Sequence, residues 1–181
     1  MDLRRRVIAM LDLSPGETVV DIASGTGLSL PLLAEAVGPA GRVIGVEISP
    51  EMMALAKARI VQGGWANIHL VEAPAETADL GAKFHAALFN YTHDVLQSPV
   101  ALRRIFSYAH PGARVAIAGI KHASRWLPPL RWYRLLKARA YVTTYAGLDR
   151  PWELLQGFVP DLQITPVMFG TNYIARGRVS A

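Results

Sequence analysis

The stretch from Thr18 to Leu30 constrains the fold more than any other part of the chain. An apolar run rich in β-branched residues ends at Asp21 and is followed by the small residues Ala23-Ser24-Gly25-Thr26-Gly27. Four leucines then follow at helical spacing, at Leu28, Leu30, Leu32 and Leu33. This pattern predicts a strand, a tight turn and a helix. Small residues let the backbone of such a turn approach a ligand closely, and the helix start offers unpaired N–H groups, which favours a nucleotide-like ligand.

Two common nucleotide-binding signatures do not fit this turn. Counted from Gly25, the dinucleotide fingerprint G-x-G-x-x-G requires a third glycine at the position of Leu30. No Gly-Lys-Ser or Gly-Lys-Thr follows, which argues against a Walker-type phosphate loop. NAD and FAD are therefore disfavoured.

The pattern Asp21-x-Ala23-x-Gly25-x-Gly27 resembles motif I of the class I S-adenosylmethionine (SAM)-dependent methyltransferases. The commonest form of that motif has glycine at the position of Ala23, and alanine is small enough to keep the turn. The resemblance implies SAM as the cofactor and S-adenosylhomocysteine as its product. It also implies a cofactor site that includes Asp21, Ala23, Gly25 and Gly27.

Glu47 is the last charged residue of a second predicted strand, Arg42 to Ile48. In a parallel sheet, an acid at the carboxyl end of the strand beside the glycine-rich turn can accept hydrogen bonds from both ribose hydroxyls. A solvated or helix-capping carboxylate is the alternative for Glu47. The segment from Val46 to Met52 also resembles the second SAM-contacting segment of the family, which implies that Glu47 holds the ribose and that Ile48 packs on adenine.

A third predicted strand, Asn67 to Val71, leads into Glu72 and Ala73. In the family, an acid and a backbone N–H of this loop cap the adenine, so the resemblance assigns these roles to Glu72 and Ala73, although aspartate is the more usual acid. The fourth predicted strand, Phe84 to Tyr91, ends in the most polar cluster at any strand end. We assign Asn90 of this cluster to the cofactor site as well.

The remaining elements predict one α/β domain over residues 1–181, with a Rossmann-like, doubly wound sheet and helices on both faces. We expect five parallel strands, the fifth over 113–120 after a turn at His110-Pro111-Gly112, and a C-terminal β-hairpin over 162–169 and 171–179. Helices are expected over 3–11, from the glycine-rich turn to 37, from 49, over 99–109 and over 151–158. The helix from 49 is expected to bury Met52, Leu55, Ala56 and Ile60.

Tyr91, His93 and Asp94 follow the fourth strand, where this fold places the acceptor. Holding acceptor and methyl carbon in line supplies most of the catalysis of a methyl transfer. Phenols and protonated amines must also lose a proton, so His93 is the candidate base. The alternative is that His93 and Asp94 only cap or solvate the next helix.

DNA is not an expected substrate of this chain. Enzymes that methylate adenine in DNA resemble one another in an Asp/Asn-Pro-Pro-aromatic motif, whereas Asn90 is followed here by Tyr91-Thr92. Carbon-5 methylation of a pyrimidine usually requires a cysteine nucleophile, and the chain has no cysteine. The absence of cysteine also excludes a disulfide framework and a thiolate metal site, and the five histidines form no metal-ligand pattern.

The net charge of +5 is concentrated in one region. No acidic residue lies between Asp94 and Asp149, whereas nine of the 19 Lys and Arg residues do. Tryptophans and tyrosines are interleaved with these cations over 121–145, which suits an apolar acceptor with an anionic group or a lipid headgroup zone. We expect residues 121–147 to form a substrate lid, with 121–139 as a candidate for peripheral membrane contact. A plain surface helix with solvated arginines is the alternative.

We expect a cytoplasmic protein of undetermined oligomeric state. The apolar stretch after Arg4-Arg5-Arg6 is too short for a signal peptide, and no window approaches the roughly 18 apolar residues of a membrane span. The leading hypothesis is SAM-dependent methyl transfer to an oxygen or nitrogen of a small or amphipathic acceptor. The alternatives are a phospholipid or quinone methyltransferase at a membrane surface, and a non-catalytic SAM-fold subunit that binds RNA or protein.

Overall fold

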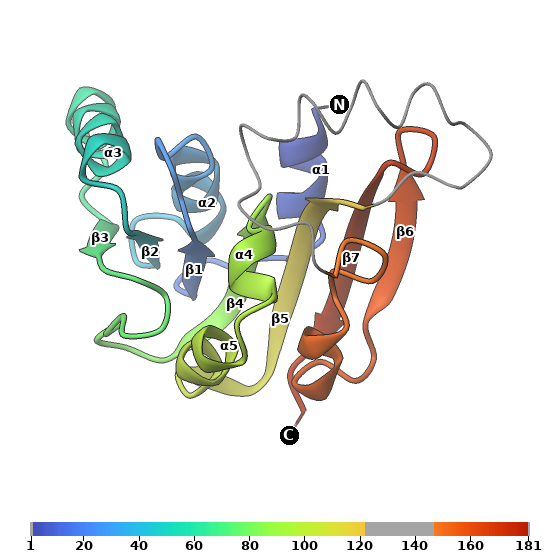
Figure 1. Cartoon of the computed structure of the whole chain (residues 1–181). Coiled ribbons are helices and arrows are strands. Elements are labelled where there is room, and N and C mark those ends of the chain that lie inside the picture. The colour runs from blue at the N-terminus through green and yellow to red at the C-terminus, as the bar shows by residue number, and fades with distance from the viewer. Residues whose placement is uncertain (1, 122–146, 181) are drawn as a thin grey trace.

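The computed structural model describes residues 2–121 and 147–180 (Figure 1). Most of the predicted lid (121–147) and of the predicted membrane contact (121–139) therefore lies outside the described residues. The described elements are, in chain order, α1 (Leu3–Ala9), β1 (Thr18–Ile22), α2 (Leu30–Val37), β2 (Arg42–Glu47), α3 (Pro50–Gly63), β3 (Ile68–Glu72), β4 (Phe84–Asn90), α4 (His93–Leu96), α5 (Pro99–Phe106), β5 (Ala109–Ile120), the 3₁₀ helix η1 (Leu154–Gly157), β6 (Gln163–Val167) and β7 (Asn172–Arg178).

The strands of the described chain form one sheet in the order β3-β2-β1-β4-β5-β7-β6. The pairs from β3 to β5 are parallel, and β7 is antiparallel to both β5 and β6. This confirms the predicted doubly wound α/β fold with five parallel strands and a C-terminal hairpin. The strand order reverses between β1 and β4, and open α/β sheets bind ligands at the carboxyl ends of the strands at such a reversal.

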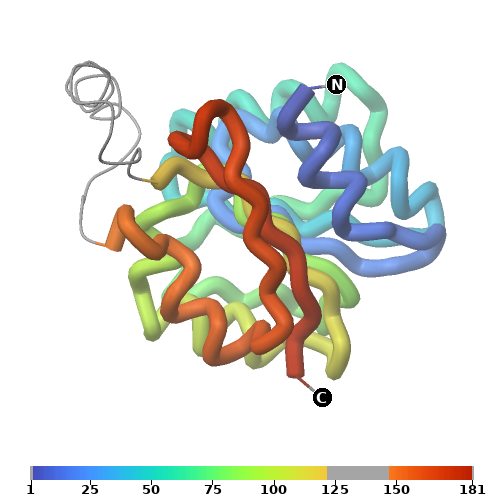
Figure 2. The backbone as a smooth tube through the Cα atoms, turned by 90° about the vertical axis from the view of Figure 1, so that its right-hand side faces the viewer, coloured from blue at the N-terminus to red at the C-terminus, as the bar shows by residue number. Residues whose placement is uncertain are grey.

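Helices cover both faces of the sheet (Figures 1 and 2). On one face, Val7 of α1 and Leu11 just after it pack with apolar residues of α2 and of the central strands. On the other face, Leu102 and Ile105 of α5 share a core with Leu155 of η1. The central strands are buried on both faces, which is why their sequences are apolar runs without alternation. None of the described helices has the length and hydropathy that a membrane span requires.

Helix α3 begins where the sequence predicts. The Ser49 hydroxyl accepts a hydrogen bond from the Met52 N–H at 3.2 Å, and Pro50 occupies the first helical position. The predicted buried stripe of α3 is wrong at two positions, because Met52 and Leu55 are 44% and 56% exposed. Ala56 is buried as predicted and Ile60 is half-buried, whereas Met53 takes the buried place that was expected of Met52. The stripe was ambiguous because apolar residues occur on both sides of this helix.

The connection between α5 and β5 also differs from the prediction. Helix α5 ends at Phe106, and β5 begins at Ala109, before the His110-Pro111-Gly112 segment that was expected to be a turn. A register shift between β4 and β5 absorbs these residues within the strand, since Phe84 pairs with Ala109 whereas Ala86 pairs with Arg114. The tail also differs in detail, because only 154–157 of the predicted helix 151–158 is helical, as a 3₁₀ turn.

Candidate functional site

The turn between β1 and α2 has three residues with positive φ: Ala23 at 53°, Gly25 at 56° and Gly27 at 76°. At Gly27 a Cβ would lie 3.1 Å from the Ala56 Cβ of α3, so a side chain there would be both strained and crowded. The Ser24 N–H donates to the Val46 carbonyl at 2.8 Å, which ties the turn to β2. The motif therefore forms a tight turn that presents backbone at the carboxyl edge of the sheet.

Glu47 ends β2 beside this turn and is 7% exposed. Its Oε2 accepts a hydrogen bond from the Gly25 N–H at 2.8 Å, and its Oε1 accepts bonds from the N–H groups of Ile48 and Ser49 at 3.0 and 2.9 Å. A carboxylate has about four lone-pair positions, so Oε2 retains acceptor capacity. The Glu47 side chain thus connects the two loops that the sequence assigns to the cofactor.

Asp21 lies next to Ile22 at the end of β1 and is 2% exposed. The pKa of its carboxyl is raised to about 7, mainly by burial, while the charge of Arg4 opposes this rise and the charge of Glu47 adds to it. Within the described chain, Oδ2 of Asp21 and Oγ of the neighbouring Ser24 find no hydrogen-bond partner. Buried polar atoms of this kind are rare in native proteins and call for a ligand or water.

Arg4 of α1 reaches the same turn from a distant part of the sequence. Its Nη1 donates to the Ser29 Oγ at 2.7 Å, immediately before α2, and its charge acts on Asp21. Sequence reasoning missed this residue. The available signal was helical spacing, since Arg4 precedes the buried residues Val7 and Leu11 by three and seven positions and shares their face.

The predicted adenine-binding residues lie at the ends of β2 and β3. Ile48 is 63% exposed just after Glu47, so its side chain is open to a ligand. Glu72 ends β3 and forms an exposed ion pair with Lys57 at 3.4 Å. The Ala73 N–H donates to the Glu47 carbonyl at 3.1 Å, so this predicted adenine donor has an acceptor within the protein. The adenine roles of Glu72 and Ala73 stay predictions.

The predicted acceptor residues follow β4 at the same edge. Asn90 is the last residue of β4, and Tyr91 has a left-handed backbone with φ of 61°. His93 is buried and starts the one-turn helix α4, whereas Asp94, the next residue, is exposed. The sequence did not predict this helix. The fold brings Asn90, Tyr91 and His93 to the strand end adjacent to Asp21, and their catalytic and binding roles stay predictions.

Asn172 at the start of β7 contacts Tyr91, one of the predicted acceptor residues. Its side-chain Nδ2 donates to the Tyr91 hydroxyl at 3.0 Å. Asn172 is only 8% exposed, so its amide is held in place and this hydrogen bond orients the Tyr91 hydroxyl. Sequence reasoning missed Asn172, because no local pattern pairs residues 81 positions apart.

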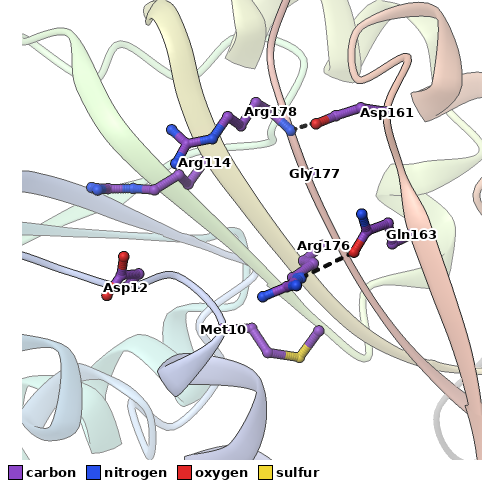
Figure 3. A pocket seen from close by; sticks show the side chains of 8 residues that line it. All are labelled: Met10, Asp12, Arg114, Asp161, Gln163, Arg176, Gly177 and Arg178. Atoms are coloured by element: carbon purple, nitrogen blue, oxygen red, sulfur yellow. Dashed lines mark hydrogen bonds between the residues drawn. The ribbon is translucent and has the colours of Figure 1, made fainter.

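A separate hollow of about 270 Å³ lies at the opposite end of β5 and β7 (Figure 3). Three arginines line it, and their main partners are within the protein: Arg114 pairs with Glu17, Arg176 Nε donates to Gln163 Oε1 at 3.3 Å, and Arg178 Nη1 donates to the Gly112 carbonyl at 3.3 Å. The hollow is at the amino ends of the parallel strands. It is therefore distinct from the edge that carries Asp21 and Glu47.

Residues 13–146 match a family model described as a methyltransferase domain. A 2-phytyl-1,4-naphtoquinone methyltransferase from Thermosynechococcus vestitus is 30% identical over 162 residues, which cover 86% of this chain and 71% of that protein. The chain belongs to the class I SAM-dependent methyltransferases. This confirms the family predicted from motif I.

Other methyltransferases match over a smaller share of their length. An arsenite methyltransferase from Halobacterium salinarum is 31% identical over 62% of this chain, but the match covers 29% of that protein. The match to a protein-L-isoaspartate O-methyltransferase from Aeropyrum pernix covers 42% of that protein. The chain thus spans less than half of these two relatives. A SAM-dependent methyltransferase structure from Aquifex aeolicus shares the fold, with a TM-score of 0.67 at 18% identity over 98% of this chain and 89% of that one.

The residues at the carboxyl edge of the sheet have a geometry that fits SAM. A glycine-rich turn without bulky side chains lies between two buried carboxylates, Asp21 and Glu47. Asp21 Oδ2 and Ser24 Oγ are polar atoms for which the described chain provides no partner. A sulfonium nucleoside with an amino-acid tail would supply hydroxyl and ammonium donors for these oxygens.

Proposed function

We propose that the chain transfers a methyl group from SAM to an oxygen or nitrogen of a small or amphipathic acceptor by in-line displacement. The observation that carries this proposal is the buried Asp21 with an unpartnered oxygen, held between the glycine-rich turn, Glu47 and Arg4 at the carboxyl edge. SAM supplies an electrophilic methyl group on a positively charged sulfur. The residues of the chain bind and orient it.

Asp21 and Arg4 match the two charges of the amino-acid tail of SAM. We assign the ammonium group to Asp21, whose Oδ2 lacks a partner within the described chain. We assign the carboxylate to Arg4, whose guanidinium keeps donors beyond the one bound to Ser29. Salt bridges of this kind are charge-assisted and therefore among the stronger hydrogen bonds of a site.

Glu47 and Ile48 would hold the nucleoside. Oε2 of Glu47 has remaining acceptor capacity toward the ribose, and Ile48 offers an exposed apolar surface to adenine. The geometry favours Ile48 over Ala73 for adenine, because the Ala73 N–H already donates to the Glu47 carbonyl. Glu72 and Asn90 complete the set of proposed cofactor residues.

Tyr91, His93 and Asp94 would act on the acceptor. The Asn172 side chain fixes the Tyr91 hydroxyl beside the strand end, so Tyr91 can orient an acceptor in line with the methyl group. His93 would take the proton that a phenol or protonated amine loses, because its imidazole lies at the start of α4 on the same edge. Residues 121–147 would cover the acceptor as a lid.

A quinone-type acceptor at a membrane surface is the second candidate. It is favoured by the relative from Thermosynechococcus vestitus, whose name gives a phytyl naphthoquinone as its substrate and which this chain matches over most of its length. The aromatic and basic composition of 121–139 supports the same assignment. We further propose a cytoplasmic location for the chain.

Titration calorimetry tests the cofactor assignment directly. We expect SAM and S-adenosylhomocysteine to bind the full chain with micromolar affinity, and Glu47→Ala to weaken both by about 1–3 kcal/mol, the scale of hydrogen bonds to a charged group. Glu35→Ala, an exposed acid on α2, is the matched control and should leave the affinity unchanged. Arg4→Gln should weaken SAM but not 5′-methylthioadenosine, which lacks the amino-acid tail, and Arg103→Gln on α5 controls for charge.

Failure of the folded chain to bind SAM would refute the enzyme proposal and favour a non-catalytic binding subunit. Equal weakening of SAM and 5′-methylthioadenosine by Arg4→Gln would refute the assignment of Arg4 to the carboxylate. For the lid, deletion of 121–147 should abolish acceptor binding while SAM binding survives. Equal loss of acceptor binding and SAM binding would contradict the assignment of 121–147 as a lid.

A further inference from the structure

The turn of the β6–β7 hairpin holds two large apolar side chains in solvent. Phe169 is 95% exposed and Met168 is 55% exposed. Both have positive φ, at 57° and 51°, a backbone conformation that costs bulky residues free energy. This conformation is pinned by the Thr171 hydroxyl, which donates to the Met168 carbonyl at 2.7 Å, and by the Gly170 N–H, which donates to the Val167 carbonyl at 3.0 Å. The fold thus maintains an exposed apolar tip rather than a collapsed one.

This hairpin tip lies at the edge of the sheet that carries the proposed cofactor and acceptor residues. Figures 1 and 2 both show it at the same edge as the start of α1 and the end of β5. The Lys121 N–H at the end of β5 donates to the Thr171 carbonyl at 3.0 Å. Asn172, the next residue, bonds Tyr91. The tip is therefore connected through two residues to the acceptor side of the site.

Positive charges lie on the elements that share this edge of the sheet with the hairpin tip. Arg5 and Arg6 are exposed on α1, and Lys121 is partly exposed at the end of β5. An apolar protrusion at an edge that also carries cations is complementary to an anionic lipid surface, where apolar side chains enter the acyl boundary and cations attract the headgroups.

We propose that Met168 and Phe169 insert into an anionic bilayer surface and dock the acceptor side of the site against it. The inference rests on the proposed function and names where the acceptor comes from: an apolar or amphipathic molecule dissolved in the lipid. A protein partner fits less well, because two side chains fall far short of the roughly 800 Å² per partner that a stable protein interface buries. A lipid surface needs only a small wedge together with electrostatic attraction.

Vesicle cosedimentation of the full chain tests this surface. We expect binding to phosphatidylcholine vesicles that contain phosphatidylserine, weaker binding to phosphatidylcholine alone, and a decrease with added salt. The double variant Met168→Ser/Phe169→Ser should weaken binding about tenfold or more, because it removes the apolar surface that enters the acyl boundary. Val61→Ser is the matched control, since Val61 is 80% exposed on α3, and it should bind like the native chain.

Two further variants separate a lipid contact from a folding defect. Phe169→Leu keeps an apolar tip and should retain most of the binding, and Arg5→Gln/Arg6→Gln should weaken binding at low salt. SAM titration of every variant reports whether the cofactor site is intact. Loss of vesicle binding with unchanged SAM affinity supports the proposal. Absence of native binding to anionic vesicles, or equal binding by the double serine variant, would overturn it while leaving the SAM proposal in place.

Discussion

Replacement of Asp21 by asparagine should stabilise the protein at alkaline pH while weakening cofactor binding. Asp21 is 2% exposed, and burial is the main reason why its pKa is raised to about 7. The native state therefore binds this proton more tightly than the unfolded chain, whose aspartate titrates near 3.8. Stability consequently falls as the pH rises through the window between these two values, because ionisation favours the unfolded chain.

The size of the effect follows from the width of that window. A shift from 3.8 to about 7 is about 3 pH units, and each unit corresponds to about 1.4 kcal/mol, so the buried carboxylate costs up to about 4 kcal/mol above neutrality. Asp21→Asn has the same shape and no charge. Its free energy of unfolding relative to the native sequence should therefore increase by about 4 kcal/mol between acidic and alkaline conditions. If the asparagine amide is left without a hydrogen-bond partner, it lowers the free energy of unfolding equally at both pH values. Its effect therefore cancels in this difference.

Urea unfolding of both proteins at about pH 4 and about pH 8 measures this difference. Calorimetry of SAM binding in two buffers of different ionisation enthalpy gives a second readout. An ammonium group beside Asp21 would lower its pKa, so binding near neutral pH should release a fraction of a proton from the native chain and none from Asp21→Asn. A stability difference that does not change with pH, or proton release that persists in the variant, would refute the buried-carboxylate reasoning.

Three other substitutions test individual contacts of the edge, each by urea unfolding. Glu47→Gln has one acceptor oxygen in place of two, so either the Gly25 N–H or the Ile48–Ser49 pair loses its bond, and stability should fall by about 1.5–3 kcal/mol. Gly119→Ala places a Cβ 2.8 Å from the ring of the buried Tyr173 and should cost about 1–3 kcal/mol. Tyr91→Phe leaves the Asn172 amide without its acceptor and should cost about 1 kcal/mol.

Matched controls accompany these three variants. Gly157→Ala should be close to neutral, because a Cβ there meets no atom within 4 Å and its φ is not in the left-handed region. Glu35→Gln on the exposed side of α2 controls for loss of charge. Native stability in Glu47→Gln or Tyr91→Phe would mean that the bonds to those side chains contribute nothing, and a stable Gly119→Ala would mean that the Tyr173 ring can move aside.

The sequence predicted the sheet and the strand-end carboxylates because both depend on local patterns. Continuous apolar runs locate the buried strands, and Asp21 and Glu47 are recognisable as acids that terminate two of them. Parallel topology then places both at one edge. Arg4 and Asn172 were missed because their partners, Ser29 and Tyr91, are distant in sequence. Helical spacing indicates which face of α1 carries Arg4, but not the residue that Arg4 contacts.

Two local details were wrong or absent for related reasons. The buried face of α3 could not be fixed because Met52 and Met53 are equivalent in hydropathy, and only packing against the sheet selects Met53. The Pro111-Gly112 pair predicts a turn by itself, yet the pairing of β5 with β4 continues across it through a register shift. In both cases tertiary contacts decide between local structures of similar free energy.

The order of strands also affects how the chain can fold during synthesis. β7 occupies the place between β5 and β6, but the ribosome makes it after both. Until Asn172–Arg178 emerges, the apolar stretch Val115–Ala118 of β5 has an open edge, and β6 has no neighbour with which to pair. A nascent chain paused before that point would present this edge to other chains or to chaperones. The sheet can therefore be completed only after synthesis of the strand that begins with Asn172, the residue that also positions Tyr91.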